Sequence, residues 1–264
     1  MKDVNDILRK ETFNTQVVIL AGGKGKRMGS IDVPKPLIKI AGETLIERCI
    51  KFYKLNGFKE FVILVGHRHD EIQSYLGDGD KLGVEIRYSV DPEGLEHVGK
   101  GKALKHAIAN GTIDRGRRAL ISYPDDLFLD VTLPTRLLLH HLEAVESKEV
   151  EATAVFTSAI EYPFGVAEVD ENGLVKSFKE KPVIKILTSC GMYLMEPPVY
   201  KLIEEKVDLE AKRAVEFEEV ILPELALRRK LYAMVIPMGV WIPINTQKEW
   251  EAAERILMSR KLPF

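Results

Sequence analysis

A glycine-rich, basic segment, LAGGKGKRMG at residues 20–29, is the first part of the sequence whose residue types could do chemistry. Glycines let a ligand approach the backbone amides closely and neighbouring cations favour an anion, so the segment predicts phosphate binding. Two common phosphate loops do not fit. A Walker loop needs Ser or Thr after Gly25-Lys26, where Arg27 stands, and the dinucleotide fingerprint needs a third glycine where Met28 stands.

Four further segments combine cations, carboxylates or amides in ways that suit phosphates and metals. They are VGKGKALK at 98–105, YPDD at 123–126, FKEKP at 178–182 and PIN at 243–245. The first is expected to follow the third strand and the second to end the fourth. Because ligands of an open α/β sheet bind beyond the carboxyl ends of its parallel strands, we expect all these segments to reach one edge of a sheet.

The elements that would position these segments alternate between strand and helix. The runs QVVIL at 16–20 and FVILV at 61–65 lack polar alternation, which is typical of parallel strands covered on both faces. The helix between them is expected to begin at a capping box of Thr44 and Glu47. After residue 160 an Asn-Gly turn predicts an inserted antiparallel hairpin. The pattern therefore predicts a Rossmann-like three-layer α/β/α sandwich with a mixed central sheet.

The composition limits the class of partner. A net charge of -2 and a pI near 6.4 argue against nucleic-acid binding. No apolar run approaches the roughly 18 residues that a membrane span needs, and two well-separated cysteines, Cys49 and Cys190, suit a reducing compartment. We therefore expect a cytoplasmic protein with no nucleic-acid or membrane partner. Abundant Lys, Glu and Arg with little Gln fit a thermophile.

An ordered set of segments resembles the sugar-1-phosphate nucleotidylyltransferase (nucleotide-sugar pyrophosphorylase) family over residues 16–257. It comprises LAGGKGKRM, PKPLIKIAGETLIE, GKGKALKHA, PDD, FGVAEVDENGLVKSFKEKP and CGMYLME. The resemblance implies transfer of a nucleoside monophosphate from a nucleoside triphosphate to a sugar 1-phosphate, with release of pyrophosphate and dependence on Mg²⁺. Because the attacking phosphate oxygen is already ionised, such an in-line displacement needs charge neutralisation and positioning more than a general base.

The resemblance also implies a domain organisation. Residues 1–15 would form an N-terminal extension, and 16–264 would form a single nucleotidyltransferase domain. Within that domain, about 16–160 would bind the nucleotide, and 161–245, including the antiparallel lobe, would bind the sugar phosphate. The amphipathic start of the chain is expected to pack as a helix on the domain or on a dimer partner, so a homo-oligomer is left open.

Individual roles follow from the resemblance as well. Arg27 would bind the triphosphate and the departing pyrophosphate, and Lys35 would bind the reacting phosphates. The nucleotide would lie on Leu20, Ala21, Gly22, Gly23 and Gly101. The sugar phosphate would lie on Gly165, Glu180 and Lys181. Mg²⁺ would lie between Asp125 and Asn245.

The metal site departs from the pattern of the family. Many members carry aspartates where WIPINT of this chain has Pro243 and Asn245. Proline has no ligating side-chain atom, whereas the neutral carbonyl oxygen of Asn245 is a donor that Mg²⁺ accepts. Asp126 is expected to face away from Asp125, because adjacent residues of an extended chain point in opposite directions.

Two other functions stay open on the sequence. Cytidylyltransferases and guanylyltransferases that act on non-hexose phosphates share the first glycine-rich segment, although FKEKP and its hairpin disfavour them. A non-catalytic sensor of nucleotide sugars is suggested by Pro243 and opposed by the intact Arg27, Lys35, Asp125 and Lys181. Neither the nucleobase nor the sugar is determined, since base recognition in this family depends largely on backbone amides.

Overall fold

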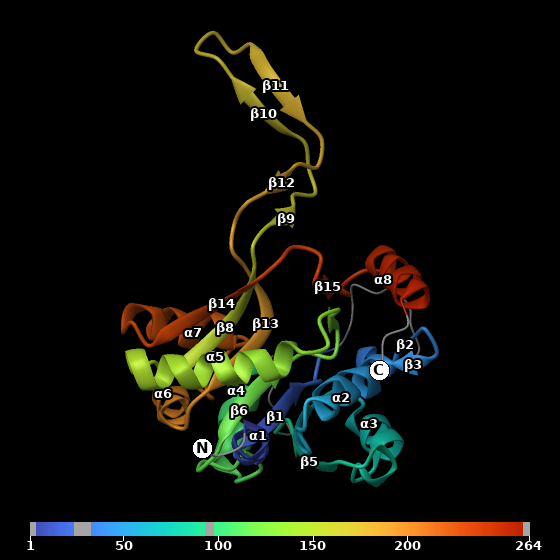
Figure 1. Ribbon diagram of the computed structural model, residues 1–264, viewed down its shortest axis with the longest axis vertical. Coiled ribbons are helices and arrows are strands. Elements are labelled where there is room, and N and C mark those ends of the chain that lie inside the picture. The colour runs from blue at the N-terminus through green and yellow to red at the C-terminus, as the bar shows by residue number, and fades with distance from the viewer. Residues whose placement is uncertain (1–3, 24–32, 93–97, 261–264) are drawn as a thin grey trace.

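A seven-stranded mixed sheet forms the centre of the computed structural model, which describes residues 4–23, 33–92 and 98–260 (Figure 1). The strand order is β14-β8-β13-β6-β1-β4-β5, and β13 alone runs antiparallel to its neighbours β6 and β8. The strands are β1 (Thr15–Leu20), β4 (Glu60–Val65), β5 (Glu85–Val90), β6 (Arg118–Ser122), β8 (Ala152–Thr157), β13 (Thr188–Met195) and β14 (Leu231–Ile236). The predicted mixed sheet is confirmed.

Helices cover both faces of this sheet. One face packs against α2 (Leu45–Leu55), α3 (His69–Leu76) and α5 (Leu133–Lys148). The other face packs against α4 (Gly99–Ala109), α6 (Pro198–Lys206) and α7 (Phe217–Leu227). In β1, Val17 and Ile19 enter the first core and Val18 and Leu20 the second, because successive side chains of a strand alternate in direction. This alternation confirms the predicted three-layer sandwich.

The predicted capping box at Thr44 forms, and a second one forms at Thr246. Thr44 accepts a hydrogen bond from the Glu47 amide at the start of α2, and Thr246 accepts one from the Glu249 amide at the start of α8 (Gln247–Ser259). Helix α8 packs in a smaller third core with the short strands β2 (Lys39–Ile40) and β3 (Glu43–Thr44). The described residues also include the 3₁₀ turns η2 (Lys35–Leu37) and η3 (Asp80–Leu82).

An antiparallel ribbon stands away from the rest of the protein (Figure 1). It continues from β8 and β13 of the central sheet through β9 (Ile160–Glu161) and β12 (Val183–Ile184), which pair with each other. Its outer part is the hairpin of β10 (Val166–Val169) and β11 (Val175–Lys179), whose turn places Gly173 at a φ of 82°. The predicted Asn-Gly hairpin is therefore present. We call residues 160–187 the arm.

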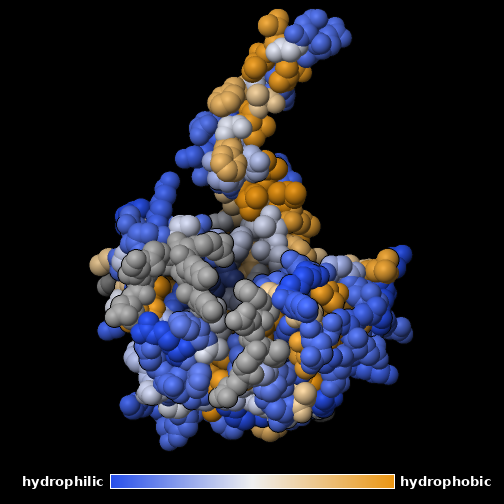
Figure 2. Space-filling model, turned by 180° about the vertical axis from the view of Figure 1, so that it is seen from behind, coloured by the Kyte–Doolittle hydropathy of each residue, from blue (hydrophilic) through white to orange (hydrophobic). Residues whose placement is uncertain are grey.

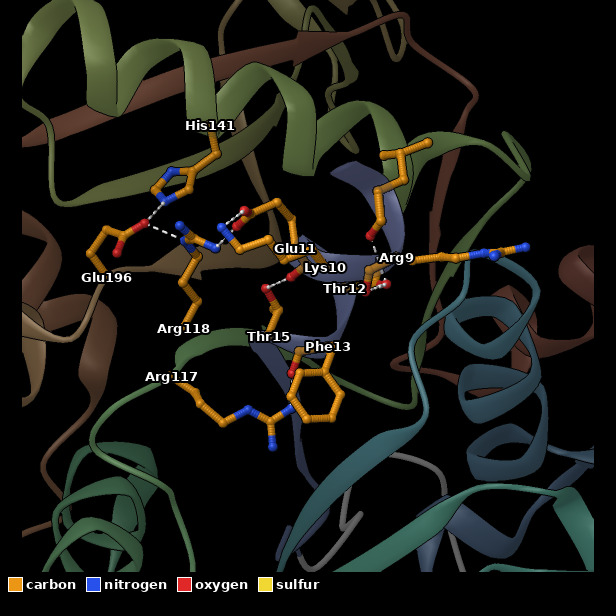
Figure 3. A network of polar contacts seen from close by, with 11 residues as sticks. Arg9, Lys10, Glu11, Thr12, Phe13, Thr15, Arg117, Arg118, His141 and Glu196 are labelled. Atoms are coloured by element: carbon orange, nitrogen blue, oxygen red, sulfur yellow. Dashed lines mark hydrogen bonds and ion pairs between the residues drawn. The ribbon is translucent and has the colours of Figure 1, made fainter. Parts of the chain in front are cut away.

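The N-terminal helix α1 (Val4–Phe13) is fixed to the domain by an ionic network (Figure 3). The Arg118 guanidinium lies 2.6 Å from a Glu11 carboxylate oxygen and 2.5 Å from one of Glu196. His141, fully buried on α5, lies 3.2 Å from the same Glu196 oxygen and 2.9 Å from the Thr153 hydroxyl. Although burial alone raises it, hydrogen bonds from His141 and Arg118 hold the pKa of Glu196 below its usual value.

Two general features bear on where the protein works. Cys49 and Cys190 are both buried and free. Among the described helices, none combines the length and the apolar character needed to cross a bilayer. The cellular compartment and the thermophilic source stay predictions, and so does the proposed division into an extension and two parts of one domain.

We expect Glu196→Gln to lower the free energy of unfolding at pH 7 by about 2 kcal/mol, because the amide cannot replace a charged hydrogen-bond acceptor. Since the pKa of Glu196 is lowered, its contribution is present at neutral pH and is lost as the pH falls below about 4.5. Urea unfolding at pH 7 and near pH 4 should show the deficit shrinking in acid. The exposed Glu143→Gln on the same helix as His141 is the control, and an equal loss there would contradict the assignment.

Candidate active site

A cleft of about 880 Å³ opens at the carboxyl ends of the parallel strands. Its walls come from the segments after β1, β5 and β6, from the amino ends of α4 and α7, and from the end of the short strand β15 (Trp241–Pro243). β15 pairs with β7 (Asp126–Phe128), which brings the C-terminal part of the chain beside the YPDD segment. The sequence segments expected at this edge are therefore largely together, with the exception of FKEKP.

Lys35, Asp125 and Asn245 line one part of this cleft. The Lys35 ammonium forms an ion pair with an Asp125 carboxylate oxygen. Asn245 is held next to this pair, because the amide of Ile244 donates to the Asp125 carbonyl oxygen at 2.8 Å. No hydrogen bond of the Asn245 side-chain amide is formed within the described residues, so its oxygen is available to a ligand.

Asp126 plays a different part from its neighbour. The Trp241 indole N–H donates to an Asp126 carboxylate oxygen at 2.7 Å, and a side chain at Gly191 would collide with the other oxygen. Burial, followed by the charge of Asp125, raises the pKa of Asp126 well above its usual value. This enclosed carboxyl connects β7 to β15 through Trp241 and packs closely against Gly191 of β13.

The glycine-rich segment contributes its described part, residues 20–23, to the cleft. The Ala21 amide is already used, since it donates to the Leu64 carbonyl at 2.8 Å. The amides of Gly22 and Gly23 form no hydrogen bond with the described part of the chain. Of the four residues predicted for nucleotide contact here, these two have donors to offer a phosphate. Arg27 lies outside the described residues.

The positive charge of Lys100, at the amino end of α4, is offset by carboxylates from a distant part of the sequence. The Lys100 ammonium lies 2.8 Å from Glu218 and 3.4 Å from Glu216, both carried by the segment at the start of α7. It also lies 5.1 Å from the centre of the Tyr123 ring, and the Tyr123 hydroxyl donates to Glu218 at 2.6 Å. The positive charge expected from Lys100 is thus held by two carboxylates within the cleft.

Asp91 is a site residue that the sequence reasoning missed. It follows β5 directly and lines the cleft, and its carboxylate accepts no hydrogen bond from the described residues. A side chain at Gly66 would collide with this carboxylate, and one at Gly22 would approach it to 3.3 Å. Burial raises the pKa of Asp91 to about 6. Its position at the end of a parallel strand was the signal that could have identified it.

Four predicted residues do not line the cleft. Gly101 is buried in α4, where a side chain would collide with the Val215 carbonyl, so packing explains this glycine. Gly165, Glu180 and Lys181 lie on the arm. The space beside Gly165, a residue expected to contact the sugar phosphate, is filled by the ring of Phe178. Lys181 adopts a φ of 45°, an unfavourable value for a residue with a side chain.

Comparison with known proteins identifies the family. The model of the nucleotidyl transferase family matches residues 16–257. The chain belongs to this family. It is 32% identical over 200 residues to a D-glycero-α-D-manno-heptose 1-phosphate guanylyltransferase of Campylobacter jejuni, with 74% of this chain and 83% of that protein covered.

A further curated relative and a solved structure are also similar to this chain over most of its length. A UTP–glucose-1-phosphate uridylyltransferase of Synechocystis is 27% identical over 262 residues, which is 94% of this chain but only 64% of that relative's length. A solved Bacillus anthracis structure, provisionally assigned as a glucose-1-phosphate thymidylyltransferase and bound to sucrose, has the same fold. It matches with a TM-score of 0.69 and 24% identity over 95% of this chain and 97% of its own.

We expect Asp91→Asn to raise the free energy of unfolding at pH 8 by about 1 kcal/mol, because the amide removes a charge whose burial is unfavourable. The sign follows from the raised pKa. The penalty is present above pH 6 and disappears as the pH falls below 3.8, where the carboxyl is protonated in both states. Urea unfolding from pH 4 to 8 should show the two proteins converging in acid. The exposed Asp208→Asn serves as control, and a gain equal to that of Asp91→Asn would contradict the assignment.

Proposed function

We propose that the protein transfers a nucleoside monophosphate from a nucleoside triphosphate to a sugar 1-phosphate and releases pyrophosphate. The observation that carries the proposal is one cleft that joins the free amides of Gly22 and Gly23 to Lys35, Asp125 and Asn245. Relatives of the same family carry this activity in their names, with uridylyl and guanylyl groups transferred to glucose or heptose 1-phosphates.

The reaction requires these residues to neutralise charge and to position the two substrates, but not to act as a general base. The phosphate oxygen of a sugar 1-phosphate is ionised at neutral pH, so no side chain has to remove a proton from the nucleophile. The amides of Gly22 and Gly23 can donate to phosphate oxygens, and the Lys35 ammonium can balance charge that grows on the departing pyrophosphate. Arg27, in the adjoining segment, is proposed to share this task.

The donor set fits a magnesium ion. Mg²⁺ binds oxygen, and this part of the cleft presents the Asp125 carboxylate, which Lys35 contacts, and the amide oxygen of Asn245. Pro243 adds no ligand atom. We therefore propose that Asp125 and Asn245 hold the ion, while Lys35 exchanges its contact with Asp125 for one with phosphate. When bound, the ion supplies charge neutralisation to the phosphate oxygens.

Asp91 supports guanine as the base. An ionised carboxylate only accepts hydrogen bonds. Guanine alone among the common bases offers two adjacent N–H donors on its pairing edge, at N1 and N2, and these match the two carboxylate oxygens. Uracil and thymine offer one donor between two carbonyl oxygens, which a carboxylate would repel. The guanylyltransferase relative at 32% identity agrees with this choice.

Pyrophosphate release from a panel of GTP, UTP, CTP, ATP and dTTP, each with common sugar 1-phosphates and Mg²⁺, tests the activity. We expect release that requires the sugar phosphate and is fastest with GTP, by at least about tenfold, one good bidentate contact being worth about 1–3 kcal/mol. Nucleotide-sugar binding without release under every condition would instead support a sensor. Preference for UTP would retain the activity and reject the role of Asp91.

Metal titration of two variants tests the magnesium ligands. We expect Asp125→Asn to slow pyrophosphate release at least about a hundredfold, since the ion and Lys35 both lose their anionic partner. Asn245→Ala should raise the Mg²⁺ concentration for half-maximal rate about tenfold, with a smaller effect at saturating metal. The exposed Asp208→Asn should behave as wild type. An unchanged Mg²⁺ requirement in Asn245→Ala would remove that residue from the site.

A further inference from the structure

The arm exposes far more large apolar side chains per residue than the rest of the described chain. Ten of the twenty large hydrophobic side chains that the structure shows exposed lie within residues 160–187, about a tenth of the chain. Figure 2 shows apolar residues along its length. They are Tyr162, Phe164, Val166, Val169, Leu174, Val175, Phe178, Val183, Ile186 and Leu187. Such a concentration marks an interaction surface, because scattered single residues are what a monomer normally exposes.

A two-stranded ribbon that packs against nothing else has low stability in water. A two-stranded hairpin is marginally stable unless an apolar face packs on something else. Pairing of Ala167 with Phe178 and of Val169 with Val175 gives this hairpin apolar cross-strand pairs, while Phe178 and Val175 remain 65% and 60% exposed. We therefore expect a partner surface to cover the exposed apolar side chains of the arm.

The arm also carries the residues that the family resemblance assigns to the sugar phosphate. Glu180 and Lys181 lie beyond the β9–β12 pair, which is continued by a hydrogen bond from the Tyr162 amide to the Pro182 carbonyl at 2.9 Å. The cleft of the same chain is lined by no residue of the arm. In this conformation Lys181 therefore lies outside the cleft of its own chain.

The charges on the arm and on the lining of the cleft are opposite in sign, which favours binding of the arm at such a cleft. The return side of the arm, residues 175–187, has four lysines and one glutamate. The described lining of the cleft has two lysines against six carboxylates, namely Asp91, Asp125, Asp126, Glu216, Glu218 and Glu219. Opposite charges of this kind orient two surfaces as they meet.

We propose that the arm docks on a second copy of this chain and delivers Lys181 and Glu180 to the mouth of that copy's cleft. Exchange of arms in both directions forms a closed two-fold dimer, in which each active site uses residues of both chains. The apolar docking is independent of the activity, whereas the role of Lys181 rests on the proposed function. The ammonium of Lys181 then meets the phosphate of the sugar.

The molar mass in solution tests the docking. We expect wild type to be a dimer by light scattering on a sizing column. Leu174→Ser combined with Phe178→Ser should be monomeric, with circular dichroism and the main thermal transition retained, because neither residue belongs to the cores of the sandwich. The control is Leu227→Ser, which replaces an 81% exposed leucine of α7 and should stay dimeric. A monomeric wild type, or an arm variant that stays dimeric, would overturn the exchange.

Mixing two inactive variants tests whether the arm serves the other chain. Lys181→Ala retains an intact cleft, and Asp125→Asn retains an intact arm. If arms are exchanged, co-expression makes mixed dimers with one complete site each, and random pairing restores about a quarter of the wild-type rate. If each arm serves its own chain, the mixture shows no more than the mean of the two variants.

The two tests separate the inference from the proposed function. Restored activity in the mixture supports both. A dimer dependent on the arm, with no pyrophosphate release by wild type on any substrate pair, retains the docking and rejects the function. An active wild type whose variants fail to complement each other rejects the exchange and leaves the function standing.

Discussion

Parallel pairing of β5, β4, β1 and β6 is the constraint on which the cleft depends. Pairs such as Leu20 with Leu64 and Ile19 with Ser122 set these strands so that their carboxyl ends finish side by side. The residues that leave the sheet there are Gly22, Gly23, Asp91 and Asp125, and they line one cavity although they are far apart in sequence. A shift of one residue in this register would turn the side chains of the shifted strand to the opposite face and displace the segment that follows it.

Electrostatics is the second constraint on the site. A reaction between two polyanions needs positive charge, yet the described lining of the cleft has more carboxylates than ammonium groups. Glu216 and Glu218 hold Lys100, and Lys35 is held by Asp125. This arrangement fixes the cations in place before substrate arrives. It also makes a metal ion and further cations from outside the described lining necessary for the proposed chemistry.

The arm connects the fold to assembly. It is a direct continuation of β8 and β13, so the strands that build the sheet also hold the arm away from the body. Its exposed apolar residues have no role in the three cores, and Lys181 carries backbone strain at the junction of its inner and outer parts. Both features agree with the proposed docking of the arm on a second copy of the chain.

Local patterns in the sequence were sufficient for much of the fold. The capping boxes at Thr44 and Thr246, the Asn172-Gly173 turn and the buried strands follow from interactions within a few residues. The same patterns placed residues 20–23, Asp125 and Asn245 at one edge of the sheet, because parallel strands end together, whereas Lys35 was assigned only by family resemblance. A residue's position along a strand or helix is a local property.

Tertiary structure alone decided which side chains face the cleft and what they meet there. Gly101 packs on Val215, a residue more than a hundred positions later, whereas Asp91 stands free in a space left by Gly66. The carboxylates that hold Lys100 come from the start of α7, which no local pattern connects to α4. The direction of the arm is likewise set by the strands that carry it. These contacts join segments distant in sequence, and their geometry exists only once the sheet and its helices have packed.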